Sequence, residues 1–282
     1  MRESRSAMLV IFTDLDGTLL DPDTYAWQDA GEALERCKRQ RVPLVLVSSK
    51  TRAEMEVLRK DLDLPWPFVS ENGGGIFFPG ACPMAPPPEA RPCENGHVLP
   101  LGVSYRRLVG FLRGIREATG WGLRGFSDMG IEEICRRTGL PPEQARLASR
   151  REYDEPFVWE GRHRPDVPAL MRAAGERGVR VTRGGRFFHL FGSCDKGEAV
   201  RRLADWFRKE HPVLWTAGLG DSANDVPMLR RVDRPILVRS AQSLSEGMET
   251  VPELRITEER GPVGWNRAVL NLLEEYSNGG MS

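Results

Sequence analysis

The sequence predicts an α/β protein, with a doubly wound parallel sheet built from both ends of the chain and a second α/β domain inserted between them. Apolar strand-like runs alternate with helix-like stretches in the first third of the chain and again after Gly192, which is the order of parallel strands joined by helical crossovers. A proline-rich stretch over residues 79–96 has no periodicity and interrupts this alternation. We therefore expect a core of residues 1–84 and 193–282 and an inserted domain of residues 85–192.

The spacing of apolar residues predicts each element of the first third. A strand, a helix, a second strand and a second helix are expected in turn over residues 9–15, 24–41, 42–49 and 51–62. Thr51 is a suitable N-cap for the second helix, and Glu54 completes a capping box. Residues 66–78 hold an Asn-Gly pair between two apolar runs, which predicts a hairpin.

The two later blocks are predicted from the same patterns. The inserted block is expected to contain helices at 104–118, 130–138, 141–150 and 167–177 and strands at 123–127, 155–160, 179–183 and 186–191. The chain is then expected to form a helix at 195–210, a strand at 213–220, a helix at 223–231, a strand at 235–239 and a closing helix at 262–276. The inserted block therefore has enough elements for a small α/β domain of its own.

Composition and charge exclude several classes of function. The 282 residues are 40% hydrophobic, which is enough for a sizeable core, and 40 basic side chains balance 40 acidic ones. No net field therefore favours nucleic acid or a membrane surface, and no apolar run reaches the roughly 18 residues of a membrane span. Five cysteines without a Cys-x-x-Cys pair predict neither a disulfide framework nor a zinc site. Because the first residues lack the apolar run of a signal peptide, we expect a cytoplasmic protein. We also expect a monomer or homodimer that acts on a small molecule.

Polar clusters follow the predicted strands, at the end of the sheet where doubly wound proteins bind ligands. Asp14 and Asp16 end the first strand, and side chains two positions apart in an extended segment point the same way. Two carboxylates held close together repel unless a cation neutralises them. An Asp-rich turn is the alternative interpretation.

Two further clusters indicate anion binding. Ser48 and Ser49 end the second strand at the start of a helix, with Lys50 next to them, and helix N-termini bind phosphate. Lys196 begins a helix, where the helix dipole disfavours a cation, so its position makes sense if an anion lies nearby. An exposed lysine is the alternative.

The fourth cluster consists of Asp221, Asn224 and Asp225 after the strand at 213–220. Helix capping would explain one acid, whereas two acids and an amide within five residues indicate oxygen ligands for a hard cation. Together the clusters supply a metal site, a free carboxylate, a hydroxyl and an ammonium, which is equipment for phosphoryl transfer. The Gly-x-x-x-x-Gly-Lys loop of P-loop nucleotidases is absent from the sequence.

In their order, the stretches "DLDGT" (14–18), "SS" (48–49), Lys196 and "GDSAND" (220–225) resemble the four motifs of haloacid dehalogenase (HAD) superfamily phosphatases. The resemblance implies a Rossmann-like HAD core, and the insertion is similar to the α/β cap of the type IIB, Cof-like branch. More narrowly, "VLVSSKTRAEM", "SENGGGIF", "REYDEPFVW", "RFFHLFGSCDKGEAV" and "GPVGWN" resemble the mannosyl-3-phosphoglycerate phosphatase family. That resemblance implies hydrolysis of mannosyl-3-phosphoglycerate to mannosylglycerate, a compatible solute.

The resemblance also implies roles for individual residues. Asp14 would attack phosphorus and become an aspartyl phosphate, and Asp16 would act as general acid and then general base. Ser48 and Lys196 would hold the phosphate oxygens. Mg²⁺ would be bound by Asp14, by the main-chain carbonyl of Asp16 and by Asp221.

Other residues are expected around this centre. Asn224 and Asp225 would orient the metal waters and the lysine. The expected substrate contacts are Ser49, Lys50, Asn72 and Gly73 from the core, with Arg151 and Arg183 for the carboxylate and Glu155 and His189 for sugar hydroxyls. A glucosyl-3-phosphoglycerate or other sugar-phosphate phosphatase, a phosphomutase of the same capped fold and a non-catalytic ligand sensor are the alternative functions.

Overall fold

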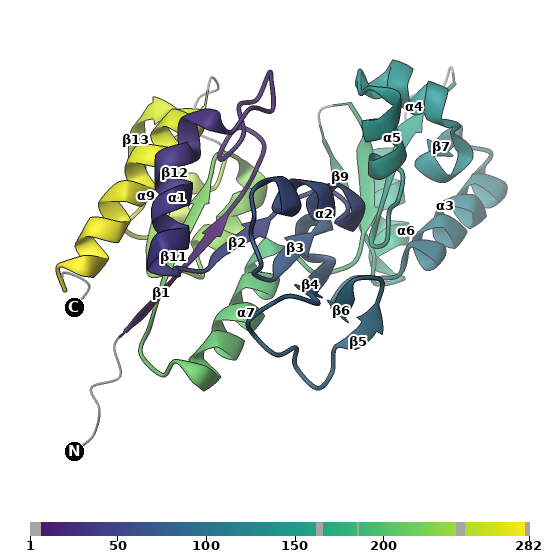
Figure 1. Cartoon of the computed structure of the whole chain (residues 1–282). Coiled ribbons are helices and arrows are strands. Elements are labelled where there is room, and N and C mark those ends of the chain that lie inside the picture. The colour runs from purple at the N-terminus through teal and green to yellow at the C-terminus, as the bar shows by residue number, and fades with distance from the viewer. Residues whose placement is uncertain (1–6, 162–165, 185, 241–245, 280–282) are drawn as a thin grey trace.

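A computed structural model shows two β-sheets flanked by helices (Figure 1), and it describes residues 7–161, 166–184, 186–240 and 246–279. The larger sheet has nine strands and is made by both ends of the chain. Its strands lie in the order β13 (Arg255–Arg260), β12 (Arg234–Arg239), β11 (Leu214–Gly220), β1 (Met8–Thr13), β2 (Leu44–Val47), β3 (Phe68–Ser70), β4 (Gly75–Pro79), β6 (Gly96–Pro100) and β5 (Arg91–Cys93). The predicted α/β architecture is confirmed.

The central strands of this sheet run parallel, so their carboxyl ends share one edge. β1 pairs with β11 up to Thr13↔Leu219 and with β2 up to Thr13↔Leu46. β3 and β4 form the predicted antiparallel hairpin around the short turn η2 (Glu71–Gly73). The ends of β1, β2 and β11 and the η2 turn carry the motifs, which brings them to this edge.

Helices cover both faces of the nine-stranded sheet. Leu9 and Ile11 of β1 pack against one set, formed by α1 (Gly31–Gln40), α2 (Arg52–Asp61) and α9 (Gly261–Ser277). Val10 and Phe12 face the other set, formed by α7 (Lys196–Glu210) and α8 (Val226–Leu229). Successive residues of a strand point to opposite faces, so a strand buried on both sides is apolar throughout, as β1 is.

The smaller sheet is antiparallel and has the order β7 (Leu123–Gly125), β8 (Asp154–Trp159), β10 (Phe188–Phe191) and β9 (Arg180–Arg183). α3 (Tyr105–Thr119) and α6 (Val167–Gly175) cover its face away from the larger sheet (Figure 1). α4 (Ile131–Thr138) and α5 (Pro142–Ala148) form a separate small cluster beside it. This block matches the predicted inserted helices and strands closely.

Three strands were not predicted from the sequence. β5 and β6 follow the proline-rich stretch and pair with β4, so residues 91–100 extend the nine-stranded sheet. This pairing favours a start of the inserted domain near residue 101, and the boundary at residue 85 stays a prediction. β13 is an edge strand of mostly polar, exposed residues, which gives it no apolar run in the sequence. Within the described ranges, no helix is both long enough and apolar enough to cross a membrane.

Candidate active site

Asp14 and Lys196 form the centre of the site. Asp14 follows the last residue of β1, and its N–H donates to the Leu219 carbonyl of the neighbouring strand at 2.9 Å. Lys196 begins α7 and is 1% exposed. Its Nζ lies 2.5 Å from Asp14 Oδ1 and 2.7 Å from Asp225 Oδ1. The two carboxylates therefore explain a cation at a helix N-terminus, because their attraction outweighs the helix dipole.

Three carboxylates meet at this point. Carboxylate oxygens of Asp14, Asp221 and Asp225 all lie within 4.8 Å of one another. Asp225 Oδ2 accepts hydrogen bonds from the N–H groups of Asp221 and Ser222, both at 3.1 Å, which fixes the loop after β11. Asp221 Oδ1 is buried and has no hydrogen-bond partner in the described part of the chain. Lys196 supplies one positive charge for three carboxylates, so the cluster has excess negative charge when all three are ionised.

The pKa values of the acids reflect this excess. Burial, followed by the charge of Asp225, raises the pKa of Asp14 to about 8, although Lys196 opposes the rise. Burial and Asp225 also raise the pKa of Asp221, to about 6. A bound cation would reverse both shifts, because it favours the ionised carboxylates. The donor set and the unpartnered Asp221 oxygen fit a hard divalent cation.

Gly17 allows Asp221 to approach this centre. Its φ of +80° lies in the left-handed region, where residues with a Cβ are strained. A Cβ at this position would lie 2.6 Å from Asp221 Oδ2. The glycine of the Asp-Gly pair therefore serves the acid cluster as well as the turn.

Asp16 lies outside the cluster of three acids. Its Oδ1 is 2.9 Å from Lys50 Nζ, and its side chain is 41% exposed. Burial lowers the pKa of Lys50, but the neighbouring carboxylates of Asp16 and Glu54 raise it. The net result is a pKa above the usual value of lysine. The side chain of Asp16 is thus partly exposed and lies beside a cation, although its Oδ1 atom is itself buried, and its expected roles stay predictions.

Ser48 lies at the end of β2, beside the η2 turn. It is 1% exposed, its Oγ accepts a hydrogen bond from Lys50 N at 3.2 Å, and its carbonyl accepts one from Asn72 N at 2.9 Å. Asn72 Oδ1 in turn accepts a hydrogen bond from Asn224 Nδ2 at 3.3 Å. Next to it, Gly73 has a φ of +100°, and a Cβ there would lie 2.2 Å from the Asp195 carbonyl. Ser48, the η2 turn, the loop after β11 and the start of α7 are therefore linked to one another at this edge of the sheet.

Arg151 of the inserted domain contacts the core beside Ser48, and His189 is linked to Arg151 through Asp154. Arg151 Nη1 donates to the Ser49 carbonyl at 3.2 Å and lies 3.3 Å from Asp154 Oδ2. His189 Nδ1 lies 2.8 Å from the same Asp154 oxygen. Asp154 was not expected from the sequence, although strand alternation places it with His189 on the sheet face opposite Phe157 and Leu190. Its other oxygen, Oδ1, is buried and unpartnered within the described ranges.

Glu155 and Arg183 are not brought to this face, which corrects the expectation that they contact substrate. Glu155 pairs with Leu190 in the register, so it points to the face that packs against α3, where it is fully buried and accepts a hydrogen bond from Ser127 N at 3.0 Å. Arg183 pairs with Phe188 and stacks on its ring at 5.9 Å. A shift of one position along a strand reverses the face of a side chain, and the sequence does not fix that parity.

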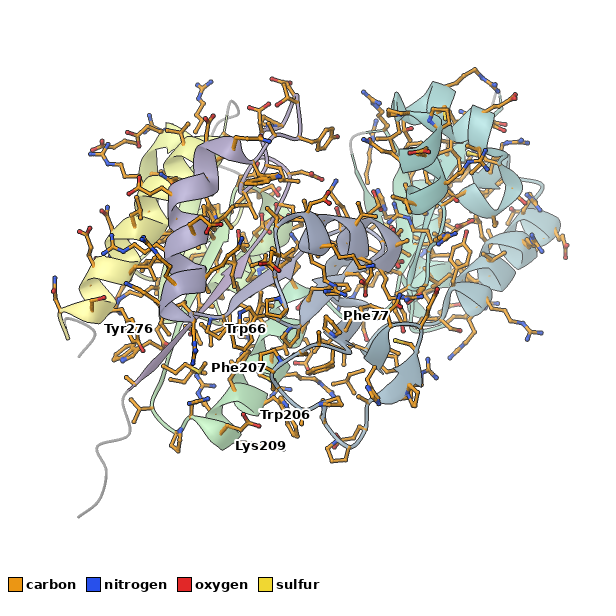
Figure 2. All side chains as sticks on the ribbon, viewed as in Figure 1. Trp66, Phe77, Trp206, Phe207, Lys209 and Tyr276 are labelled. Carbon is orange, nitrogen blue, oxygen red and sulfur yellow. The ribbon has the colours of Figure 1, made fainter. Side chains whose placement is uncertain are left out.

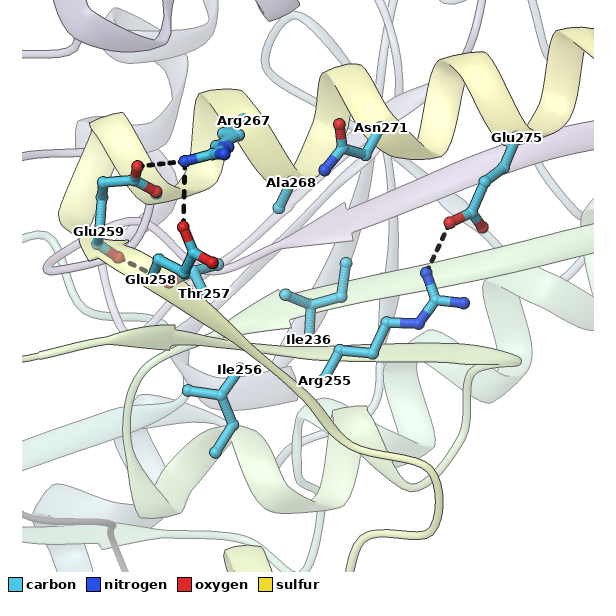
Figure 3. A pocket seen from close by; sticks show the side chains of 11 residues that line it. Ile236, Arg255, Ile256, Thr257, Glu258, Glu259, Arg267, Ala268, Asn271 and Glu275 are labelled. Atoms are coloured by element: carbon cyan, nitrogen blue, oxygen red, sulfur yellow. Dashed lines mark hydrogen bonds and ion pairs between the residues drawn. The ribbon is translucent and has the colours of Figure 1, made fainter.

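A separate hollow between β13 and α9 does not compete with this site (Figure 3). Its charged side chains pair with each other: Arg267 lies 2.6 Å from Glu259, and Arg255 lies 2.7 Å from Glu275. These pairs leave no set of convergent polar groups for a ligand.

Comparisons with known proteins find related phosphatases. A family model described as haloacid dehalogenase-like hydrolase matches residues 11–81. The glucosyl-3-phosphoglycerate/mannosyl-3-phosphoglycerate phosphatase of Methanococcoides burtonii is 41% identical over 271 residues, covering 95% of this chain and 98% of the relative. An equally named protein of Persephonella marina is 40% identical, covering 96% and 99%. The mannosyl-3-phosphoglycerate phosphatase of Pyrococcus horikoshii is 35% identical, covering 82% and 90%.

Solved structures share the fold. A protein from Thermotoga maritima has a TM-score of 0.66 at 17% identity and covers 94% of this chain and 97% of its own. A sugar phosphatase of HAD subclass IIB has a TM-score of 0.60 at 14% identity, covering 94% and 99%. The solved structures show the fold alone, whereas the sequence relatives show the family. This chain belongs to the mannosyl-3-phosphoglycerate phosphatase family of HAD-like hydrolases.

Proposed function

We propose that this protein is a Mg²⁺-dependent phosphatase that hydrolyses mannosyl-3-phosphoglycerate to mannosylglycerate and phosphate. The observation that supports it most is the buried Lys196 between Asp14 and Asp225, with Asp221 completing a cluster of three acids. Such a centre holds an anionic nucleophile next to the charges that a phosphoryl group needs. The substrate follows from the names of relatives that are 35–41% identical to the chain.

Asp14 is the proposed nucleophile. Its carboxylate oxygen forms a bond to phosphorus, the bond between phosphorus and the glycerate oxygen breaks, and an aspartyl phosphate results. Asp16 gives its proton to the departing oxygen, and the partial exposure of its side chain beside Lys50 supports this role. In the second half, Asp16 accepts a proton from the water that attacks phosphorus, and the bond to Asp14 breaks to release phosphate.

The other residues hold charge and geometry. Lys196 and the Ser48 hydroxyl bind the oxygens of the phosphoryl group, and Asp225 keeps Lys196 in place. Asp14, Asp221 and the main-chain carbonyl of Asp16 would hold Mg²⁺, which when bound supplies positive charge between the carboxylate and the anionic phosphate. Asn224 links the loop after β11 to Asn72.

The inserted domain is proposed to select the substrate. Arg151 contacts the core at the Ser49 carbonyl, and His189 is linked to Arg151 through Asp154. Because Nδ1 of His189 is engaged by Asp154, Nε2 is the ring nitrogen left for a sugar hydroxyl. Arg151 offers charge to the glycerate carboxylate.

Glucosyl-3-phosphoglycerate is a second proposed substrate. Two relatives with at least 40% identity carry both substrates in their names, and the two sugars differ at one carbon only. The two substrates share the phosphate and the glycerate carboxylate, so the proposed contacts of Lys196, Ser48 and Arg151 serve both.

The proposal is tested by kcat/KM for both glycosyl phosphoglycerates beside a panel of simple sugar phosphates, with free phosphate as the readout. We expect the glycosyl phosphoglycerates to lead the panel, EDTA to stop turnover and Mg²⁺ to restore it. Release of free phosphate without a bisphosphate cofactor would exclude a phosphomutase. Turnover in EDTA, or no turnover of any phosphate ester, would contradict the proposed function.

A further inference from the structure

The stretch "GPVGWN", residues 261–266, opens α9 far along the chain from the acids, and the proposed mechanism does not use it. Trp265 from this stretch is fully buried in the core between α9 and the nine-stranded sheet. Its indole Nε1 donates a hydrogen bond to Thr13 Oγ1 at 2.9 Å. Thr13 Oγ1 in turn donates to the main-chain carbonyl of Asp14 at 2.8 Å. A continuous chain of hydrogen bonds therefore joins this stretch to the proposed nucleophile.

The direction of this chain is fixed by chemistry. An indole N–H is a donor only, so Trp265 occupies a lone pair of the Thr13 hydroxyl. The single hydroxyl proton is then left for the Asp14 carbonyl. Without the indole, the hydroxyl is free to rotate and to use its proton elsewhere.

The Asp14 carbonyl has a particular need for such a donor. The pairing of β1 with β11 ends at Thr13↔Leu219, so this carbonyl lies beyond the last ladder pair. Leu219 holds the Asp14 N–H on one side, and Thr13 holds the carbonyl on the other. Together they fix the peptide planes on both sides of the Asp14 Cα, and those planes set the direction of its carboxylate.

Neighbours of Trp265 hold the indole in place. A Cβ on Gly264 would lie 2.2 Å from the Glu259 carbonyl, so the glycine allows α9 to begin this close to β13. Asn266 Oδ1 accepts a hydrogen bond from Ala33 N at 2.9 Å, which ties the same turn to α1. Each residue of Gly264–Asn266 therefore contributes to placing the indole.

We propose that Trp265, acting through Thr13, is a positioning residue for Asp14. It orients the main chain of the nucleophile so that the carboxylate meets both Lys196 and the phosphorus. This inference rests on the proposed role of Asp14, because it assigns a function to the backbone geometry of that residue. A misplacement of the nucleophile affects the chemical step and leaves substrate binding largely intact.

The test uses Trp265→Phe, which keeps an aromatic ring and removes the N–H. We expect kcat to fall about tenfold with KM within about twofold of the wild type, because a small misplacement costs rate rather than affinity. Trp206→Phe is the matched control, since its indole donates to the Ala85 carbonyl at 2.9 Å near the far end of α7 (Figure 2). That control also loses an indole hydrogen bond of 2.9 Å, although a more exposed one, and its kcat should stay at the wild-type value.

Thr13→Val tests the same link from its other end and serves if Trp265→Phe does not fold. Its control is Thr216→Val in β11, which removes a buried hydroxyl bonded to Asp233 at 2.7 Å. In the double variant of Thr13 and Trp265, kcat should be no lower than in either single variant, because both break one chain.

The outcomes separate this inference from the proposed function. A wild-type kcat in Trp265→Phe or Thr13→Val, an equal loss in the matched controls, or multiplied losses in the double variant would overturn the positioning role alone. A wild type that hydrolyses no phosphate ester would contradict the proposed function, and the inference would fall with it.

Discussion

Asp221→Asn removes one charge from the cluster of three acids while it preserves the shape of the side chain. In the metal-free protein, the ionised form of this aspartate destabilises the fold, since burial and Asp225 raise its pKa from 3.8 to about 6. The folded protein then binds this proton more tightly than the unfolded chain does. The stability contributed by the protonated Asp221 is therefore fully present below about pH 4 and is lost as the pH rises towards 6.

The size of this effect follows from the same pKa. The difference between 3.8 and about 6, at 1.36 kcal/mol per unit, corresponds to about 3 kcal/mol of destabilisation at pH 8. We expect Asp221→Asn in EDTA to be more stable than the wild type at pH 8 by about 2–3 kcal/mol, and the two proteins to be equal near pH 4. With Mg²⁺ at a hundred times the Kd, the advantage of the variant should shrink to near zero, because the wild type gains about 2.7 kcal/mol and the variant lacks this metal ligand.

Urea denaturation at several pH values, with EDTA or with Mg²⁺, measures these differences. Asp205→Asn is the control, because Asp205 is half exposed on α7 and its ion pair with Arg201 at 2.8 Å lies on the surface. Its stability should stay within about 1 kcal/mol of the wild type in both buffers. Equal stability of Asp221→Asn and the wild type in EDTA at pH 8 would refute the charge argument, and so would an undiminished stabilisation of the variant by Mg²⁺.

Three further variants test other parts of the site. Lys196→Met should lower kcat by about 10²-fold or more and the free energy of unfolding by about 3–5 kcal/mol, because it strands two buried carboxylates; activity near the wild-type level would contradict its role. Gly17→Ala should weaken Mg²⁺ binding in calorimetry, since its Cβ would lie 2.6 Å from Asp221 Oδ2, and an unchanged Kd would show that the close approach is unimportant. Asp154→Asn should raise KM for glycosyl phosphoglycerates about tenfold while kcat changes little, because it frees His189 and Arg151; a loss confined to kcat would instead place Asp154 in the chemical step.

Much of the core site was predictable because parallel strands end at one edge of a sheet. Asp14, Ser48 and Asp221 follow three such strands, and the strand order β11-β1-β2 places these three strand ends side by side. The capping box of Thr51 and Glu54 is local in sequence and is also confirmed. These features depend on spacing within a few residues or on a general property of the fold.

Other contacts depend on register and packing, which the sequence does not state. Glu155 and Asp154 are neighbours on β8, and only the pairing with β10 decides which of them lies beside His189. The hydrogen bond between Trp265 and Thr13 joins residues 252 positions apart. β13 was not predicted because an exposed edge strand needs no apolar run.

In the proposed mechanism, Asp14 carries the phosphoryl group. A single turnover of mannosyl-3-phosphoglycerate, quenched in acid within milliseconds and digested for mass spectrometry, detects this group on the protein. We expect a phosphorylated peptide that contains Asp14, which disappears when the quench is delayed and never forms in Asp14→Asn. Release of phosphate by Asp14→Asn at the wild-type rate, or a covalent phosphate on another residue, would contradict the mechanism.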